Sequence, residues 1–283
     1  MRVDKQLADS NLVTSLEQLS SSAGVDLLSV AYGCIGAAGS NIPLVADWIR
    51  ESLGVRVGGS LLLVEDIEIA LNAAFPGTRG VLLLAGTGSN AAARSDNGTL
   101  IRAGGWGPVL GDQGSGYAIG ILALRNLFTA IDDGLQSDLL IAILQFWRLD
   151  SISSLIEHVH SNPPPDFSQL VRLVVEAATD GDSVASATLT QAGNDLAHLA
   201  SSVIRKLQLS EGTDWTDNVH VALAGSVLQE IGVVRVQMEL ELRQNFPNVI
   251  FPPGLPDPVM GALWQARLAH RASLSQRRTN ELE

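Results

Sequence analysis

The sequence has a single cysteine, Cys34, among its 283 residues. One cysteine excludes a disulfide within the chain and a metal site built only from cysteine ligands. Basic residues are also few: 18 lysines and arginines stand against 30 aspartates and glutamates, a formal net charge of -12. Because polyanions repel an acidic chain, we expect no nucleic acid and no membrane among its partners.

Long hydrophobic runs are missing as well. The apolar runs at 117–124 and 139–144 are far too short to cross a bilayer, and no apolar stretch follows the charges of the first residues. Hydrophobic residues nevertheless make up 46% of the chain and charged residues 17%, a composition typical of folded globular proteins. We therefore expect a soluble cytoplasmic protein with two modest domains.

The first quarter of the chain alternates between helical and strand patterns. Apolar spacing and proline position predict helices at 7–23, 43–53 and 67–75, and apolar runs predict buried strands at 27–35 and 61–64. Helices that alternate with short buried strands are typical of an α/β unit with parallel strands.

After Pro76-Gly77 the pattern changes to strands separated by glycine turns. We predict strands at 80–85, 90–94 and 99–103 with a hairpin turn at 96–98, a helix at 115–131, mostly helix from 138 to 209 with a break at 162–165, a strand at 218–224 and a closing helix at 258–270. The predicted domains are 1–75, 76–270 and a polar, frayed tail at 271–283.

Asp66 follows directly on a predicted buried strand. In α/β sheets the ligand crevice lies beyond the carboxyl ends of strands. A carboxylate there can take the proton of a substrate hydroxyl while that oxygen attacks a phosphoryl group. Taken alone, Asp66 is also explained as the N-cap of the helix that begins at Ile67.

Two glycine-rich segments follow. Gly86-Thr87-Gly88-Ser89 comes after a strand, and its backbone N–H groups and two hydroxyls can face phosphate oxygens; an ordinary hairpin turn is the alternative. The stretch Gly104–Gly116 has six glycines in thirteen residues by the sequence GGWGPVLGDQGSG. Within it, Asp112 either caps a helix or accepts hydrogen bonds from sugar hydroxyls, and Trp106 either packs on a sugar face or fills a gap in the core.

Other candidate residues have simpler explanations. His158 and His160 stand two apart on a predicted helix and so face different sides, which makes them a poor metal pair. Cys34 lies in an apolar strand, where a free cysteine acts as a small hydrophobic side chain. Asp182 most simply caps the helix that follows it. We predict no metal-ligating residue.

The ordered motifs resemble a known family. VEDIEIALNAAF and GVLLLAGTGSNAAARSDNGTLIRAGGWGPVLGDQGSGYAIG, with weaker matches at VHVALAGSV and PDPVMGALWQAR, resemble the N-acetylglucosamine kinases and the BadF/BadG/BcrA/BcrD-type ATPases of the ASKHA superfamily. The resemblance is strongest from Leu61 to Gly120. It implies an α/β fold of two RNase-H-like (actin-like ATPase) domains around a cleft.

The resemblance implies a role for each matching residue. Asp66 corresponds to the catalytic base of the kinases. The nucleotide-binding residues would be Gly86, Thr87, Gly88 and Ser89, with Gly225 and Ser226 in the adenosine motif. The sugar-binding residues would be Asn90, Gly105, Trp106, Gly107 and Asp112. The cofactors implied are ATP and Mg²⁺, and the substrate is a sugar hydroxyl; homodimer formation stays open.

One family motif has no counterpart in this sequence. Family members begin with a strand that carries an Asp-Gly-Gly-Gly-Thr motif, whereas this sequence starts at what resembles the first helix of the N-terminal domain, so we expect that domain to be truncated to about two strands of its sheet. Either the sequence is a fragment, or it is a short form that has lost phosphotransfer. Two other functions therefore stay open. One is a non-catalytic sugar sensor. The other is a BadF-type ATPase that activates a partner enzyme through an iron–sulfur cluster shared across a dimer; that mechanism needs two cysteines in each subunit, and this chain has only Cys34.

Overall fold

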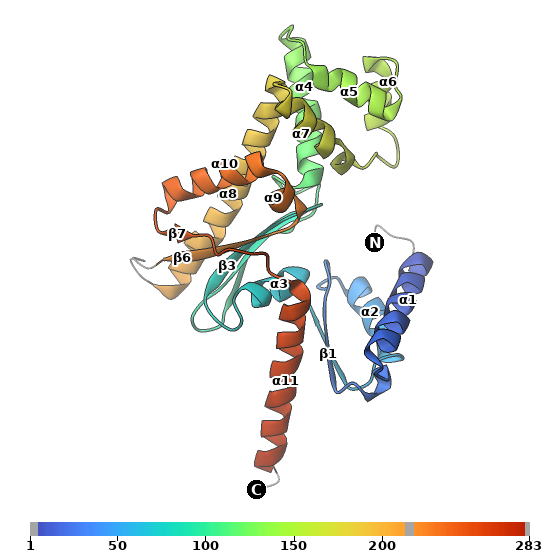
Figure 1. The fold of residues 1–283 in the computed structure, drawn as a ribbon, viewed down its shortest axis with the longest axis vertical. Coiled ribbons are helices and arrows are strands. Elements are labelled where there is room, and N and C mark those ends of the chain that lie inside the picture. The colour runs from blue at the N-terminus through green and yellow to red at the C-terminus, as the bar shows by residue number, and fades with distance from the viewer. Residues whose placement is uncertain (1–4, 213–217, 281–283) are drawn as a thin grey trace. The chain divides into compact units, whose positions relative to one another are not determined.

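A computed structural model of the chain describes residues 5–212 and 218–280 (Figure 1). The chain forms two compact units. Unit 1 consists of Met1–Gly77 and Pro256–Glu283, and unit 2 consists of Thr78–Leu255. Both are α/β units, in agreement with the fold class predicted from the sequence.

Unit 1 contains a small parallel sheet with helices packed against it. Its elements are α1 (Lys5–Ala23), η1 (Leu27–Ser29), β1 (Tyr32–Gly36), α2 (Pro43–Gly54), β2 (Ser60–Val64), α3 (Asp66–Ala74) and α11 (Pro258–Asn280). Strands β1 and β2 are parallel, with Tyr32 opposite Ser60 and Gly36 opposite Val64. The expected parallel pair of strands is therefore confirmed.

The closing helix α11 belongs to unit 1. The second domain, predicted to reach residue 270, therefore ends at Leu255. Helix α11 packs along α3 and against β1. The two helices approach closely, since a side chain at Gly261 would collide with the carbonyl oxygen of Ile69. The helix also continues to Asn280 through the segment we expected to be a frayed tail, and its His270 ring packs edge-on against Tyr32, with the ring centroids 5.2 Å apart. The partner of α11 lies some 190 residues away in sequence, so local patterns could not indicate it.

The other departure from prediction lies at the start of β1. The apolar run 27–35 predicts one strand, but Leu27–Ser29 forms a 3₁₀ turn. The carboxylate of Asp26 accepts a hydrogen bond from the Leu28 backbone N–H at 2.9 Å, which stabilises the turn, and the strand begins only at Tyr32.

Unit 2 holds a five-stranded sheet in the order β5-β4-β3-β6-β7. Its elements are β3 (Gly80–Ala85), β4 (Ser89–Arg94), β5 (Leu100–Gly104), α4 (Gly116–Asp132), α5 (Asp138–Trp147), α6 (Ile152–Val159), η2 (Phe167–Leu170), α7 (Val171–Thr179), α8 (Ser183–Glu211), β6 (Val219–Ala224), α9 (Ser226–Glu230), α10 (Gly232–Asn245) and β7 (Val249–Ile250). Strands β3, β4 and β5 form an antiparallel meander, and β6 runs parallel to β3. The strands β3 to β6 and helix α4 match the predicted ones within about two residues, whereas α9, α10 and β7 have no predicted counterpart.

The core of unit 2 lies on one face of this sheet. Val81, Leu83 and Ala85 alternate along β3 and point toward α4 and α8, where Ile119 and Leu196 are fully buried. Because β6 is parallel to β3, their carboxyl ends lie at the same edge of the sheet. The turns at that edge carry the candidate site.

Among residues 5–212 and 218–280, no single helix has both the length and the apolar character that a membrane span needs. The pair α5 and α6 reaches that length and composition only when taken together, and the two helices are bent by 62°.

Candidate functional site

The segment Gly86-Thr87-Gly88 is the turn between β3 and β4. Ala85 pairs with Ser89 across the hairpin, and the Gly86 N–H donates to the Gly88 carbonyl at 2.9 Å. The hairpin interpretation is therefore confirmed for the backbone. The phosphate-loop interpretation is compatible with it, because Thr87 lies exposed at the tip.

The turn after β6 packs against the end of β3. Gly225 has φ 93°, and a side chain there would collide with the carbonyl oxygen of Ala85. Next to it, Ser226 has its Oγ atom 3.8 Å from the place that a Gly86 Cβ would occupy. Only glycine allows both the positive φ and the close backbone approach. The two predicted nucleotide motifs therefore meet at one edge of the sheet.

Helix α4 starts at the same place. The Gly116 N–H donates to the Gly86 carbonyl at 2.8 Å, and Ser115 caps the helix by accepting a hydrogen bond from Ala118 N–H at 3.2 Å. The N-terminus of a 17-residue helix carries a partial positive charge. This charge lies beside the Gly86–Ser89 turn, where it favours a bound anion.

Asp112 joins the two glycine-rich segments. The residue is buried and has φ 63°, and its Oδ1 accepts a hydrogen bond from the Ser89 N–H at 3.3 Å. The Ser89 hydroxyl in turn donates to the Gln113 carbonyl at 2.7 Å. The cap hypothesis for Asp112 is wrong, because Ser115 caps α4. Its carboxylate instead lies against the turn at Gly88 and Ser89.

Asn90 and Gly105 lie next to each other beyond this turn. The place of a Gly105 Cβ is 3.4 Å from the Asn90 Cβ. The Oδ1 atom of Asn90 is buried without a hydrogen-bond partner among the described residues. A buried acceptor without a partner is costly, so it indicates a position that a donor from outside the chain can fill.

Trp106 lies on the loop that follows Gly105 and is 73% exposed. The core-filling hypothesis for this residue is therefore wrong. Gly107 in the same loop has φ 83°, which lets the chain turn back. An exposed indole on a loop beside a polar site is a typical sugar-stacking group.

Asp66 is the only predicted site residue that belongs to unit 1. It lies half-buried in the first turn of α3, directly after β2, and its Oδ1 accepts the Ile67 N–H at 2.9 Å. The N-cap position itself is held by Glu65, whose side chain makes no cap bond. The N-cap hypothesis for Asp66 is thus wrong, although the carboxylate does stabilise the first turn.

The remaining candidates lie outside this site. Asp182 caps α8 by accepting from Ala185 N–H at 2.9 Å and from the Ser137 hydroxyl at 2.6 Å. Burial alone would raise the pKa of its carboxyl, but these hydrogen bonds outweigh it and lower the pKa below 3.8. His158 packs against the Trp147 ring at 4.7 Å. Burial, with a smaller effect of the Glu68 charge, raises the pKa of the Cys34 thiol to about 11.

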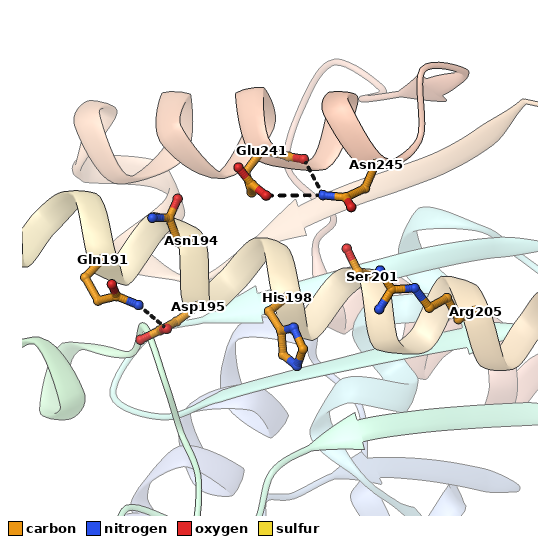
Figure 2. A pocket seen from close by; sticks show the side chains of 8 residues that line it. All are labelled: Gln191, Asn194, Asp195, His198, Ser201, Arg205, Glu241 and Asn245. Carbon is orange, nitrogen blue, oxygen red and sulfur yellow. Dashed lines mark hydrogen bonds between the residues drawn. The ribbon is translucent and has the colours of Figure 1, made fainter.

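One cavity of unit 2 has no counterpart in the sequence motifs (Figure 2). It has a volume of about 430 Å³ and lies between α8 and α10. Its lining is polar: Gln191 donates to Asp195 at 2.8 Å within α8, and Asn245 donates to Glu241 at 3.2 Å within α10. The Asn194 amide oxygen accepts a hydrogen bond from Gln237 of α10 at 2.9 Å, which joins the two helices. Because two helices far apart in sequence form the cavity, no local pattern could indicate it.

Comparisons with known proteins agree with this geometry. The pattern of the BadF/BadG/BcrA/BcrD ATPase family matches residues 1–266. The chain is 31% identical over 241 residues to an N-acetylmuramic acid/N-acetylglucosamine kinase of Clostridium acetobutylicum, a match that covers 83% of this chain and 76% of the relative. It is 32% identical over 244 residues to an N-acetyl-D-glucosamine kinase of Dictyostelium discoideum, with 83% and 75% covered.

A solved structure is similar as well. It comes from Chromobacterium violaceum and is itself assigned only provisionally as an N-acetylglucosamine kinase. The two folds superpose with a TM-score of 0.69 at 28% identity, over 92% of this chain and 86% of the other. The fold is thus the two-unit α/β architecture of the sugar kinases.

Proposed function

Because the chain belongs to the BadF/BadG/BcrA/BcrD ATPase family, we propose that it transfers the γ-phosphoryl group of ATP to a sugar hydroxyl, most simply the 6-hydroxyl of N-acetylglucosamine. The observation that carries the proposal is the meeting of three elements in unit 2: the Gly86–Ser89 turn, the Gly225–Ser226 turn and the N-terminus of α4. Two curated relatives that match this chain over 83% of its length are kinases of this kind.

The nucleotide binds at this edge of the sheet in our proposal. The Thr87 hydroxyl and the backbone N–H groups of Thr87 and Gly88 face the phosphate oxygens, and the adenosine lies beside Ser226 in the neighbouring turn. Phosphoryl transfer depends mainly on positioning and on neutralising phosphate charge. Oriented backbone dipoles and the positive end of α4 do both without adding a charged side chain.

Mg²⁺ would accompany ATP and neutralise phosphate charge. That ion usually keeps several waters and takes most of its other ligands from substrate phosphates, so the proposal does not require a cage of protein ligands.

The sugar binds beside the nucleotide in our proposal. The Asn90 Oδ1 atom accepts a hydrogen bond from the sugar, Gly105 and Gly107 let the backbone approach it, and Trp106 covers one face of the ring. Asp112 accepts a second hydrogen bond from a sugar hydroxyl while its Oδ1 holds the Ser89 N–H. This double role joins the sugar site to the phosphate turn through one carboxylate.

Asp66 acts as the general base in this mechanism. Its position in the first turn of α3 leaves the carboxylate half-buried directly after β2, with its Oδ1 on the Ile67 N–H. It takes the hydroxyl proton as the sugar oxygen attacks the γ-phosphorus, and the β–γ bond of ATP breaks to release ADP.

The test is an ATP-dependent phosphorylation assay with N-acetylglucosamine on the full chain and on Asp66→Asn. We expect kcat to fall at least about 100-fold, because general-base catalysis contributes that much or more, while sugar binding measured by calorimetry is retained. Asp47→Asn is the matched control, since it removes an exposed carboxylate of unit 1 that pairs with Arg50 at 3.4 Å.

Two outcomes would contradict the proposal. Unchanged turnover in Asp66→Asn would exclude Asp66 as the base. Sugar binding without any turnover in the unaltered chain would favour a sugar sensor in place of a kinase. The partner-activating ATPase is the weaker alternative, because the single cysteine of this chain has a thiol held protonated near neutral pH.

A further inference from the structure

Unit 1 contains a second cavity, which the proposed mechanism does not use. Its volume is about 370 Å³. The end of α3 and the turn after it contribute Asn72, Ala73 and Pro76, and one face of α11 contributes Met260, Trp264, Arg267, Leu268 and Arg271. None of these residues belongs to the site described above.

The lining residues of α11 follow helical spacing. From Met260 they stand at i+4, i+7, i+8 and i+11, which places them on one face. The Trp264 ring is fixed at one end of this face, because its Cζ2 atom lies 3.1 Å from the place of a Gly77 Cβ. The cavity therefore offers a positioned aromatic ring with aliphatic side chains beside it.

Two guanidinium groups border the same cavity. Arg267 and Arg271 make no hydrogen bond or ion pair through their side chains with any residue that the structure describes. Other arginines pair within their own helices: Arg50 with Asp47 at 3.4 Å, and Arg235 with Glu239 at 2.8 Å. The segment 258–280 has four arginines and no aspartate or glutamate, in a chain of net charge -12. The cavity thus carries a local positive charge on an acidic protein.

We propose that this cavity binds a small phosphate monoester carried on a ring. Two arginines one helical turn apart suit a phosphate of charge about −1.5 to −2, which can accept hydrogen bonds from both guanidinium groups. The ring packs against Trp264 and Leu268. A volume of about 370 Å³ fits a ligand the size of a sugar phosphate or a nucleoside monophosphate and is too small for a polymer.

The position of the cavity gives such a ligand a route to the catalytic machinery. Helix α3 has nine residues: Asp66 lies in its first turn, and Asn72 and Ala73 near its other end line the cavity. Asn72 is fully buried and donates to Gln265 of α11 at 2.8 Å, so the two helices are joined by a hydrogen bond at the cavity wall. A ligand bound in the cavity would stabilise this α3–α11 pair. An effect of the ligand on turnover rests on the proposed function, whereas binding of the ligand to the cavity does not.

Calorimetry on the full chain at low ionic strength tests the proposal with three probes: N-acetylglucosamine 6-phosphate, AMP and inorganic phosphate. We expect a ring-bearing phosphate to bind about tenfold more tightly than inorganic phosphate. The double variant Arg267→Gln/Arg271→Gln should weaken that binding at least about tenfold, since each lost charged hydrogen bond costs roughly that factor. Arg50→Gln is the matched control and should leave binding unchanged.

A second variant separates the contribution of the ligand's ring to binding from that of its phosphate. In Trp264→Leu the preference for a ring-bearing phosphate over inorganic phosphate should disappear, while circular dichroism shows that the fold is retained. If the double variant binds every probe as tightly as the unaltered chain does, the proposal is overturned. It is also overturned if the unaltered chain binds all three probes equally tightly. If the chain binds a probe through Arg267 and Arg271 but phosphorylates no sugar, the cavity assignment holds and only the proposed function fails.

Discussion

The two units differ in how deeply their sheets are buried. In β3 of unit 2, five of six residues are buried, and the side chains of Val81, Leu82 and Leu83 are completely inaccessible. In unit 1 no residue of β1 or β2 is fully buried: every residue is half-buried except Ser60, which is exposed. Unit 2 is therefore built around its sheet, whereas the buried residues of unit 1 lie mainly on its helices, such as Leu53 and Leu71.

This difference predicts where stability and adaptability lie. A fully buried leucine contributes roughly 1.5–3 kcal/mol by transfer from water, and a half-buried one contributes correspondingly less. Unit 2 can hold the Gly86–Ser89 and Gly225–Ser226 turns in fixed positions because the strand before the first turn is buried at five of its six residues. Unit 1 has fewer buried residues in its strands, so the free energy needed to unfold unit 1 locally should be lower than that for unit 2.

Paired leucine truncations test the comparison most strongly. Leu83→Ala in β3 should lower the free energy of unfolding by about 4 kcal/mol, because the cavity it leaves lies in a closed core. Leu62→Ala in β2 should cost about 1 kcal/mol, because this side chain is only half-buried. Urea unfolding followed by circular dichroism measures both. Equal costs in the two variants would break the comparison.

A pair of glycine substitutions tests whether the glycines at the ends of strands are packed more tightly in unit 2 than in unit 1. Gly225→Ala should destabilise unit 2 by about 3 kcal/mol and weaken ATP binding, since its Cβ meets the Ala85 backbone at φ 93°. Gly36→Ala in unit 1 meets only the side chain of Ile69 and should cost about 1 kcal/mol. Thermal unfolding and nucleotide titration give both values.

Gly181→Ala measures the cost of a side chain at positive φ where no atom lies close to it. Gly181 has φ 94°, and its Cβ would meet no atom within 4 Å, so only the conformational cost of about 1 kcal/mol remains. Should Gly181→Ala destabilise the protein as much as Gly225→Ala, the close approach to Ala85 would have no energetic role.

A last prediction concerns the reactivity, not the stability contribution, of Cys34 in β1. Because its thiol pKa is raised to about 11, the reactive thiolate should be about 100-fold scarcer at pH 8 than in an ordinary cysteine. Alkylation by iodoacetamide should therefore be slow at pH 8 and accelerate as pH rises toward 11. Urea just below the unfolding transition should speed the reaction if unit 1 opens first. A fast reaction at pH 8 in the absence of urea would show that β1 is less protected than its burial implies.

Much of unit 2 could be predicted from the sequence because glycines follow its strands and a capping serine precedes α4. The strands ending at Ala85 and Ala224 and the helix starting near Ser115 each follow local rules of apolar spacing and capping. The close packing of Gly225 on Ala85 could not be predicted from spacing alone, since it depends on β6 pairing beside β3. The family resemblance supplied that juxtaposition as an expectation, and the structure places the two turns together.

Unit 1 was harder to predict. Strand β1 begins at Tyr32 and not at Leu27, and a run of apolar residues does not reveal that Asp26 starts a 3₁₀ turn. Helix α11 belongs to unit 1, which spacing cannot show, because it indicates which face of a helix is apolar and not which distant surface that face covers. For the same reason the cavity lined by Trp264 and Arg267 left no signal that a motif could reveal.

That unit 1 is made of two segments separated by unit 2 has a consequence for biosynthesis. Residues 1–77 are translated before α11, which packs on α3 and β1. Unit 2, continuous from residue 78 to 255, can complete its own fold during translation. Residues 1–77 must therefore wait for α11, so a released fragment that ends at residue 255 should hold a folded second unit and a protease-sensitive first one.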